Sequence, residues 1–337
     1  MKLGILADIH LAGYSQDPVV SKTGLSERLH YLNIVVRNSL DEIIDSGIDN
    51  VVFLGDTYHT KSIIHSNAQS VLLNIIRDYK DKIHFIILDG NHDMSSKSGE
   101  GVSALISCDN EPNVTMIHEP KEIDNIWFVP WNEKTMVDSI KNGSPNNVPY
   151  LMAHLGLNEG MLNSGISLVS DIGLKDLKRY KKVYLGHYHK AQELGNTIYV
   201  GSQIQMDWGE KHEEKRYLIV DTDKDTCISV PTKGYKKYYE FKVTNENIKD
   251  VIEQVKLVQG EGHNFKIKKI EDLNPNELEE NYNVIDDTDK DVTNRGITSS
   301  MSIADKIDKY LEIKKIPSNK IDLYKSVGLD VINSCYR

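Results

Sequence analysis

The stretch Phe85-Ile86-Ile87-Leu88-Asp89-Gly90-Asn91-His92-Asp93 joins four consecutive apolar residues to a polar turn that carries a histidine. A short apolar run bounded by turn-forming residues is typical of a buried strand. Glycine, asparagine and aspartate favour the turn that follows such a strand. The stretch therefore predicts a strand that ends in a loop rich in oxygen and nitrogen donors.

Four further segments repeat this arrangement of an apolar run followed by aspartate or histidine. The runs are Leu3–Ala7, Val51–Leu54, Tyr150–Met152 and Val183–Leu185, and the residues that follow them include Asp8, His10, Asp56, His154, His187 and His189. Loops beyond strand ends can converge on one rim of a sheet. Independent turns would not share this placement, so we interpret the five segments as one site.

The donors expected in this site are carboxylate oxygens, an amide oxygen and imidazole nitrogens, without sulfur. This mixture suits a pair of hard or borderline divalent ions such as manganese, whereas magnesium prefers a shell of oxygen ligands. Two such ions together promote in-line attack on a phosphate ester. The motifs therefore predict a metal-dependent phosphodiester hydrolase, with manganese as the favoured ion and magnesium as the second choice.

Composition limits the class of protein. The 337 residues are 39% hydrophobic and 27% charged, as in globular proteins, and no apolar run approaches the length of a membrane span, so we expect no membrane partner. Three widely spaced cysteines, Cys108, Cys227 and Cys335, indicate the reducing cytoplasm. The net charge of −10 argues against a protein that coats DNA, although bound divalent cations would supply local positive charge.

Residues 1–232 alternate strand-like and helix-like segments, which indicates an α/β domain with a second sheet packed on the first. One helix is expected to begin after Ser26 and to end at Gly47, and a second is expected at His65–Tyr79. The alternation weakens after Val114, where short strands predominate.

The remainder of the chain has a different character. Residues 233–292 are expected to form a small β-α-β unit followed by an acidic linker at 271–291. Residues 293–337 are expected to form two amphipathic helices, the first preceded by a capping box that begins at Ser302.

The motifs together resemble the calcineurin-like metallophosphoesterase superfamily, and within it the SbcD-type nuclease subunits of double-strand-break repair, including the phage recombination nuclease subunit. Gly55-Asp56-Thr57-Tyr58-His59 has a histidine three residues after the aspartate, as these nucleases do. The motifs Gly-Asp-x-x-Asp-Arg-Gly and Gly-Asn-His-Glu of the superfamily's protein phosphatases do not occur in the chain. Gly201–Gln205, Trp208-Gly209-Glu210 and Glu213-Glu214-Lys215 resemble a further nuclease segment.

The resemblance implies a two-sheet sandwich of the αββα type, with a small α/β capping domain and a C-terminal helical pair. It also implies the ligands of two divalent ions. The first ion would be held by Asp8, His10, Asp56 and His189, and the second by Asp56, Asn91, His154 and His187. Asp56 would therefore bridge the two ions.

The resemblance further implies three catalytic residues. His92 would donate a proton to the phosphate or to the leaving oxygen, and Asp93 would orient His92. His59 would contact the scissile phosphate or help to place the DNA.

The function that follows is a two-metal DNA exonuclease and endonuclease subunit in recombination, repair or DNA end processing. DNA and an SbcC-type coiled-coil ATPase are the implied partners, a second copy of the chain is a further candidate, and the cytoplasm (of the host, for a phage protein) is the expected location. The alternative is a phosphodiesterase or phosphatase for a small nucleotide or phosphoprotein, which the acidic charge favours and His59 disfavours. A metal-binding scaffold without catalysis is a third hypothesis, against which His92 and Asp93 argue.

Overall fold

The computed structural model describes residues 1–20, 22–61, 63–96, 101–162, 169–270, 284–286, 302–314 and 317–335. The chain divides into two compact units, Met1–Lys237 and Tyr238–Arg337. All five motifs lie in the first unit. The two-sheet α/β sandwich that the sequence predicts is confirmed there.

The first sheet has six strands in the order β12-β11-β1-β2-β3-β4. The strands are β1 (Lys2–Leu6), β2 (Asn50–Leu54), β3 (His84–Leu88), β4 (Val114–Ile117), β11 (Arg216–Asp221) and β12 (Thr226–Pro231). Strands β1 to β4 pair in parallel, and β11 and β12 extend the sheet in antiparallel fashion. The carboxyl ends of β1, β2 and β3 therefore meet at one edge.

The second sheet also has six strands, in the order β5-β6-β7-β8-β10-β9. The strands are β5 (Lys121–Ile123), β6 (Ile126–Val129), β7 (Tyr150–His154), β8 (Lys182–Gly186), β9 (Gln192–Leu194) and β10 (Thr197–Tyr199). The four inner strands are parallel, and β5 and β9 are antiparallel edges. The ends of β7 and β8 thus share one edge, as the motifs require.

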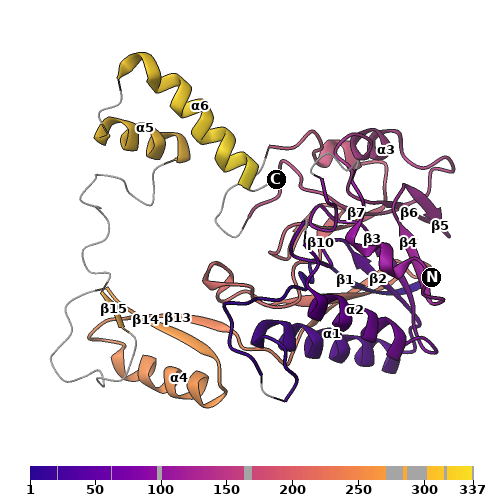
Figure 1. The fold of residues 1–337 in the computed structure, drawn as a ribbon, viewed down its shortest axis with the longest axis horizontal. Helices are drawn as coiled ribbons and strands as arrows, with labels where there is room; N and C mark the ends of the chain where they lie inside the picture. The colour runs from indigo at the N-terminus through magenta and orange to yellow at the C-terminus, as the bar shows by residue number, and fades with distance from the viewer. Residues whose placement is uncertain are drawn as a thin grey trace. The chain divides into compact units, whose positions relative to one another are not determined.

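Alternating side chains of each strand build the layers. Leu3 and Ile5 of β1 pack with Met152 of β7 in the core between the two sheets. Leu6 points to the opposite face of the first sheet, where it joins the core beneath helices α1 (Glu27–Asp45) and α2 (Ser66–Asp78). Figure 1 shows these two helices side by side below the sheet. Helix α3 (Met136–Asn142) contributes Ile140 to the core on the outer face of the second sheet.

The helix boundaries follow the signals in the sequence. Helix α1 begins directly after its N-cap residue Ser26, and Gly47 adopts a φ of 73° just beyond the C-terminus. Helix α2 begins after His65, as expected, and buries the apolar stripe that includes Leu72 and Ile76. The amphipathic pattern therefore sets both the length and the buried face of each helix.

The second unit contains the expected β-α-β arrangement. Strands β13 (Tyr238–Val243) and β14 (Asn264–Lys269) are parallel, and α4 (Ile248–Gly260) packs on them through Val251 and Val255. A third strand, β15 (Val284–Asp286), pairs with β14. The interpretation of residues 284–286 as acidic linker is therefore wrong, because two β-branched residues suffice for a short strand inside a charged surrounding. The rest of the expected linker at 271–291 lies outside the described residues.

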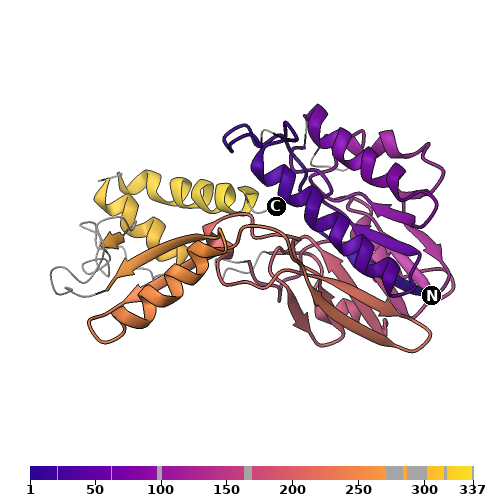
Figure 2. The same ribbon diagram turned by 90° about the horizontal axis from the view of Figure 1, so that it is seen from below.

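The C-terminal helices are α5 (Ile303–Ile313) and α6 (Ser318–Cys335). Ser302 caps α5, since its Oγ accepts a hydrogen bond from the backbone N–H of Asp305 at 3.1 Å. Figure 2 shows the two yellow helices, and several apolar side chains on them are exposed, namely Tyr310, Leu323, Tyr324 and Val327. None of the helices in the described part of the chain has the length and apolar character needed to cross a membrane.

Candidate metal centre

The loops that follow β1 and β2 are tied together by backbone hydrogen bonds. The N–H groups of Asp8 and His10 donate to the carbonyls of Gly55 and Asp56, at 3.2 and 3.0 Å. The backbone of Leu11 continues this pairing with Thr57 and His59. Two motifs that are far apart in the sequence thus form a single rigid frame.

Four of the expected ligand residues have a left-handed backbone. The φ angles are 50° at Asp8, 56° at His10, 51° at Asp56 and 100° at His187. This conformation costs a residue other than glycine roughly 1–3 kcal/mol, and it persists only where the surrounding structure enforces it. Such strain accumulates at functional sites.

Glycines in the motifs allow the loops to approach one another. A Cβ on Gly90 would collide with the backbone nitrogen and the carboxylate of Asp56, and a Cβ on Gly55 would collide with the ring of His154. The ligands could not be gathered with larger residues at these two positions.

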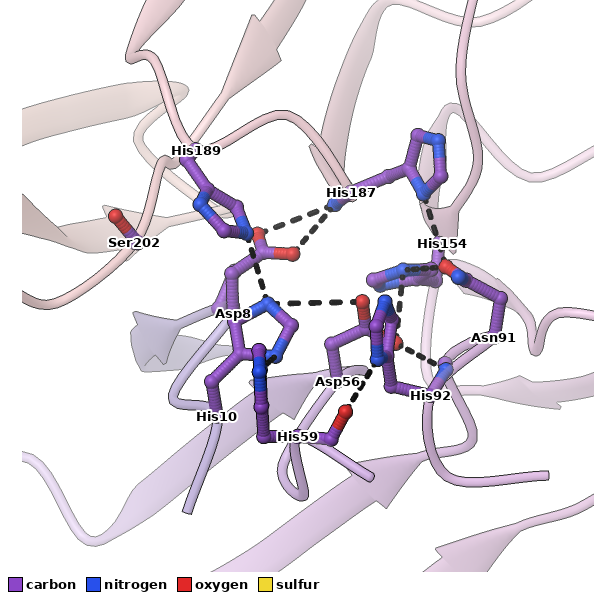
Figure 3. Close-up of polar contacts among 12 residues, drawn as sticks. Asp8, His10, Asp56, His59, Asn91, His92, His154, His187, His189 and Ser202 are labelled. Carbon is purple, nitrogen blue, oxygen red and sulfur yellow. Dashed lines mark hydrogen bonds and ion pairs between the residues drawn. The ribbon is translucent and has the colours of Figure 1, made fainter. Parts of the chain in front are cut away.

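Asp8, His10 and His189 form the first group of donors, shown in Figure 3. The Nε2 atoms of His10 and His189 are 2.8 Å apart. Two nitrogens bound to one ion at about 2.1 Å and at right angles would be about 3 Å apart. All three side chains come from loops that follow strands, and Asp8 and His10 are 1% exposed.

Asn91, His154 and His187 gather in a second group. The Oδ1 atom of Asn91 lies 3.0 Å from Nε2 of His154 and 2.9 Å from Nδ1 of His187. Nδ1 of His154 donates to the carbonyl of Leu54 at 2.9 Å, which leaves Nε2 to face the group. An amide oxygen, two imidazole nitrogens and a carboxylate form a suitable ligand set for a borderline divalent ion.

Asp56 lies between the two groups. Its Oδ1 is 3.3 Å from Nε2 of His154, and its Oδ2 is 3.8 Å from Nε2 of His10. The backbone N–H of His92 donates to Oδ1 at 2.8 Å and holds the carboxylate in this position. The arrangement fits a carboxylate shared by two ions, as expected for Asp56.

The electrostatics of the site favour metal binding by several imidazoles. Burial lowers the pKa of His10 well below its ordinary value and that of His187 to about 3. Partial burial of the ring, together with the nearby His92 and His189, lowers the pKa of His59 to about 4. These rings are therefore neutral at pH 7, which is the form that binds a metal ion.

The two carboxylates of the site differ. Burial raises the pKa of Asp8 to about 6, in spite of the nearby His154 and His189. Burial opposes the ionisation of Asp56 as well, but the charge and hydrogen bond of His154 hold the pKa of Asp56 well below its ordinary value. Asp56 is thus an anion that attracts cations to the middle of the site.

His59 and His92 stack beside the first group, with ring planes 16° apart and centroids 5.7 Å apart. Nδ1 of His92 donates to the carbonyl of His59 at 2.5 Å. Nδ1 of His59 lies 3.3 Å from Nδ1 of His10. The structure therefore brings both expected catalytic histidines close to the expected metal ligands.

Among the residues that the structure describes, no hydrogen bond joins Asp93 to the imidazole of His92, contrary to the expectation that Asp93 orients that ring. Its fully buried carboxylate accepts hydrogen bonds from the backbone N–H groups of Thr57, Tyr58 and Gly90, at 3.2, 2.8 and 2.9 Å. Asp93 instead fastens the loop after β2 to the loop after β3.

Glu210 and Lys215 are site residues that the motifs alone did not identify. Oε1 of Glu210 accepts a hydrogen bond from Nδ1 of His189 at 2.7 Å, and Oε2 pairs with Nζ of Lys215 at 2.8 Å. Both side chains are almost fully buried, at 2% and 1% exposed. The burial of these two charged side chains cannot be predicted from the composition of a loop that is rich in charged residues. The resemblance of the segment around Glu210 to the nucleases was the available signal.

The sequence of residues 1–191 matches the family model of the calcineurin-like phosphoesterases. The chain belongs to this family. Proteins of the family hydrolyse phosphoesters with two divalent metal ions, and the two donor groups around Asp56 are the candidate positions for them.

The individual proteins to which the chain is similar share only a low sequence identity with it. The chain is 23% identical to exonuclease subunit 1 of Enterobacteria phage T4 over 249 residues, which cover 65% of this chain and 70% of the phage protein. It is 23% identical to the SbcD component of the SbcCD nuclease of Staphylococcus epidermidis over 301 residues, which cover 77% and 78% of the two chains. A solved structure of an archaeal phosphodiesterase is similar to 68% of this chain and 99% of its own, at 14% identity and a TM-score of 0.35.

Proposed function

We propose that the chain is a two-metal DNA nuclease subunit, with exonuclease and endonuclease activity, that acts with an SbcC-type ATPase. The observation that carries the proposal is the pair of donor groups joined by Asp56, flanked by the stacked rings of His59 and His92. The names of the two relatives, an exonuclease subunit and a nuclease subunit, support a nucleic acid as the substrate.

The residues fit two divalent ions. Asp8, His10 and His189 would hold the first, Asn91, His154 and His187 the second, and Asp56 both. When bound, the ions act as Lewis acids on the phosphate and lower the pKa of a water nucleophile. Mixed imidazole and carboxylate donors favour manganese over magnesium.

The hydrogen bonds around His59 assign its protons. When His10 uses Nε2 as a ligand, its proton is on Nδ1, which donates to Nδ1 of His59 at 3.3 Å. The proton of His59 is then on Nε2, and the ring is a donor for a phosphate oxygen. The exposed position of His59 makes it accessible to a substrate.

His92 also has one ring nitrogen engaged in a hydrogen bond with the protein and the other available for the substrate. Since its Nδ1 donates to the carbonyl of His59, its Nε2 is the atom that can deliver a proton to the leaving oxygen. Asn91 cannot play this part, because an amide has no useful pKa and its oxygen faces His154 and His187.

The test is an assay of the full chain with manganese on linear duplex DNA, a chromogenic phosphodiester and a chromogenic phosphomonoester. We expect cleavage of DNA and of the diester, much poorer activity with magnesium, and none in EDTA. Asp56→Asn should abolish activity. Asp78→Asn, which alters an exposed surface ion pair with Arg37, is the matched control.

A preference for the phosphomonoester, with intact DNA, would favour the alternative of a small-molecule or phosphoprotein phosphatase. Undiminished DNA cleavage in EDTA, or full activity of Asp56→Asn, would contradict the metal mechanism itself.

A further inference from the structure

A buried ion-pair network lies behind His189, on the side away from the other ligands of the first ion. Its members are Glu210, at the end of the short helix η3 (Trp208–Glu210), and Lys215, just before β11. Glu213 is a third, more exposed member, with its side chain 17% accessible. The network connects a metal ligand to a segment that carries none of the five motifs.

Lys215 is fully satisfied in this network. Its three ammonium protons match three acceptors, which are Oε2 of Glu210 at 2.8 Å, Oε2 of Glu213 at 2.8 Å and the carbonyl of His189 at 3.0 Å. A buried charge is tolerated only when it is paired and hydrogen-bonded in this way. Lys215 therefore neutralises Glu210 and also holds the backbone of His189.

Glu210 is equally constrained. Its Oε2 accepts from Lys215 and from the backbone N–H of Met206 at 2.9 Å, with the hydroxyl of Ser202 at 3.4 Å. Oε1 faces Nδ1 of His189 at 2.7 Å. A carboxylate can only accept, so Nδ1 of His189 carries the proton and Nε2 presents its lone pair toward His10.

In the second donor group, the partner behind His154 carries no charge. Nδ1 of His154 donates to a neutral backbone carbonyl, that of Leu54. A carboxylate partner raises the basicity of a ligating imidazole more than a neutral carbonyl does. The two ion positions thus differ in what stands behind their histidines.

We infer that Glu210, charge-balanced by Lys215, is a positioning residue that sets the tautomer and orientation of His189 for the first metal ion. The inference rests on the proposed assignment of His189 as a ligand of that ion. Positioning carboxylates of this kind change metal affinity by roughly 10–100-fold when they are removed.

Glu210→Gln gives the sharpest test. The amide oxygen should stay with the donors of Lys215 and Met206, so the amide NH₂ turns toward Nδ1 of His189. Nδ1 must then accept, and the ring proton moves to Nε2, the atom that the ion needs. Nitrogen NMR of the metal-free protein, at a pH where the ring is neutral, should report this exchange of tautomer.

Calorimetric titration with manganese is the second readout. We expect Glu210→Gln to weaken the first ion by roughly 10–100-fold and the second by much less. Glu213→Gln, which removes a carboxylate from the same lysine without touching His189, should leave both affinities within about twofold, as expected for a partly exposed pair. Glu210→Asp, which keeps the charge but shortens the reach, should recover part of the affinity and keep the proton on Nδ1.

His189→Ala distinguishes a failure of the role inferred for Glu210 from a failure of the assignment of His189 as a metal ligand. Loss of one ion in His189→Ala, with an unchanged tautomer and affinity in Glu210→Gln, overturns the role of Glu210 alone. Unchanged binding of both ions in His189→Ala overturns the ligand assignment on which it rests. If Glu210→Gln does not fold, an affinity of Glu210→Asp equal to that of the parent protein overturns the inference.

Discussion

The Nε2 atoms of His10 and His189 lie 2.8 Å apart, although the residues are 179 positions apart in the sequence and follow strands of different sheets. In the metal-free protein one ring must donate to the other at this distance. A divalent cation can take the place of that shared proton and bind both lone pairs. The contact therefore marks where the first ion is expected.

Substitution of His92 should separate catalysis from metal binding. Nδ1 of His92 is used by the carbonyl of His59, and the ring is stacked on His59 outside the two donor groups. We expect His92→Gln to bind two manganese ions as the parent protein does and to lower turnover by roughly 10²–10⁴-fold, the usual contribution of a positioned proton donor. Manganese calorimetry combined with the diester assay measures both quantities.

His154→Ala is the contrasting variant. The buried ring of His154 faces Asp56 and Asn91, so we expect its removal to abolish binding of the second ion. If His92→Gln also failed to bind an ion, His92 would be a ligand and its assignment as an acid would be wrong.

Asp93→Asn should act mainly on stability. The substitution turns an acceptor of three backbone N–H groups into an amide that must place its own NH₂ against one of them. We expect a loss of roughly 2–4 kcal/mol in the free energy of unfolding, since a buried donor is left without a partner. Urea denaturation of the metal-free protein measures it. Equal stability of Asp93→Asn and the surface control Asp78→Asn would show that the carboxylate does not fasten the loops.

His118 should make stability depend on pH on the alkaline side. A hydrogen bond from Nδ1 to Asp89 at 2.6 Å is the main cause that raises the pKa of His118 to about 9, against burial and with help from Asp109 at 2.9 Å. The unfolded value is near 6.5, so this stabilisation is complete below about pH 6.5 and is lost as the pH rises through 9. We expect His118→Gln to be less stable than the parent by roughly 1 kcal/mol at pH 6, because partial exposure weakens the pair, and equally stable at pH 10.

Urea denaturation across this pH range measures the difference. Asp109→Asn should lower the pKa of His118, so the stabilisation by His118 should be lost at a lower pH than in the parent protein. A stability difference of the same size at pH 6 and pH 10 would mean that His118 acts through packing rather than charge.

Removal of the C-terminal helices should uncouple the chain from the proposed ATPase partner. Helix α6 exposes Leu323 at 63% and Val327 at 47%, and α5 exposes Tyr310 at 43%. Amphipathic helices with such side chains can bind in a groove of a partner protein. A chain truncated before Gly296 should fold, bind manganese and cleave the chromogenic diester, but lose ATP-stimulated degradation of duplex DNA with the SbcC-type ATPase present. Copurification of the truncated chain with the ATPase, as complete as that of the full chain, would contradict the assignment.

The sequence predicts the fold of the first unit well, because strand runs such as Leu3–Ala7 are unbroken and the loops after them carry the polar residues. The same regularity predicts that Asp56 and His189 lie together. It does not predict the partners of Asp93, since two of the three are backbone N–H groups of another loop and no residue type encodes them. The burial of Glu210 and Lys215 at the site could not be predicted from residue patterns either, because a loop so rich in charge has the composition of a solvated surface.

Each ion position draws donors from both sheets. The first combines Asp8 and His10, which follow β1, with His189, which follows β8, and the second combines Asn91 with His154 in the same way. The proposed metal centre would therefore be a reversible cross-link between the two layers of the sandwich. An ion that binds the folded chain alone would add about 2.7 kcal/mol to the free energy of unfolding when the free ion is at 100 times its Kd. The supply of divalent ions would then govern how long the protein survives in the cell as well as how fast it works.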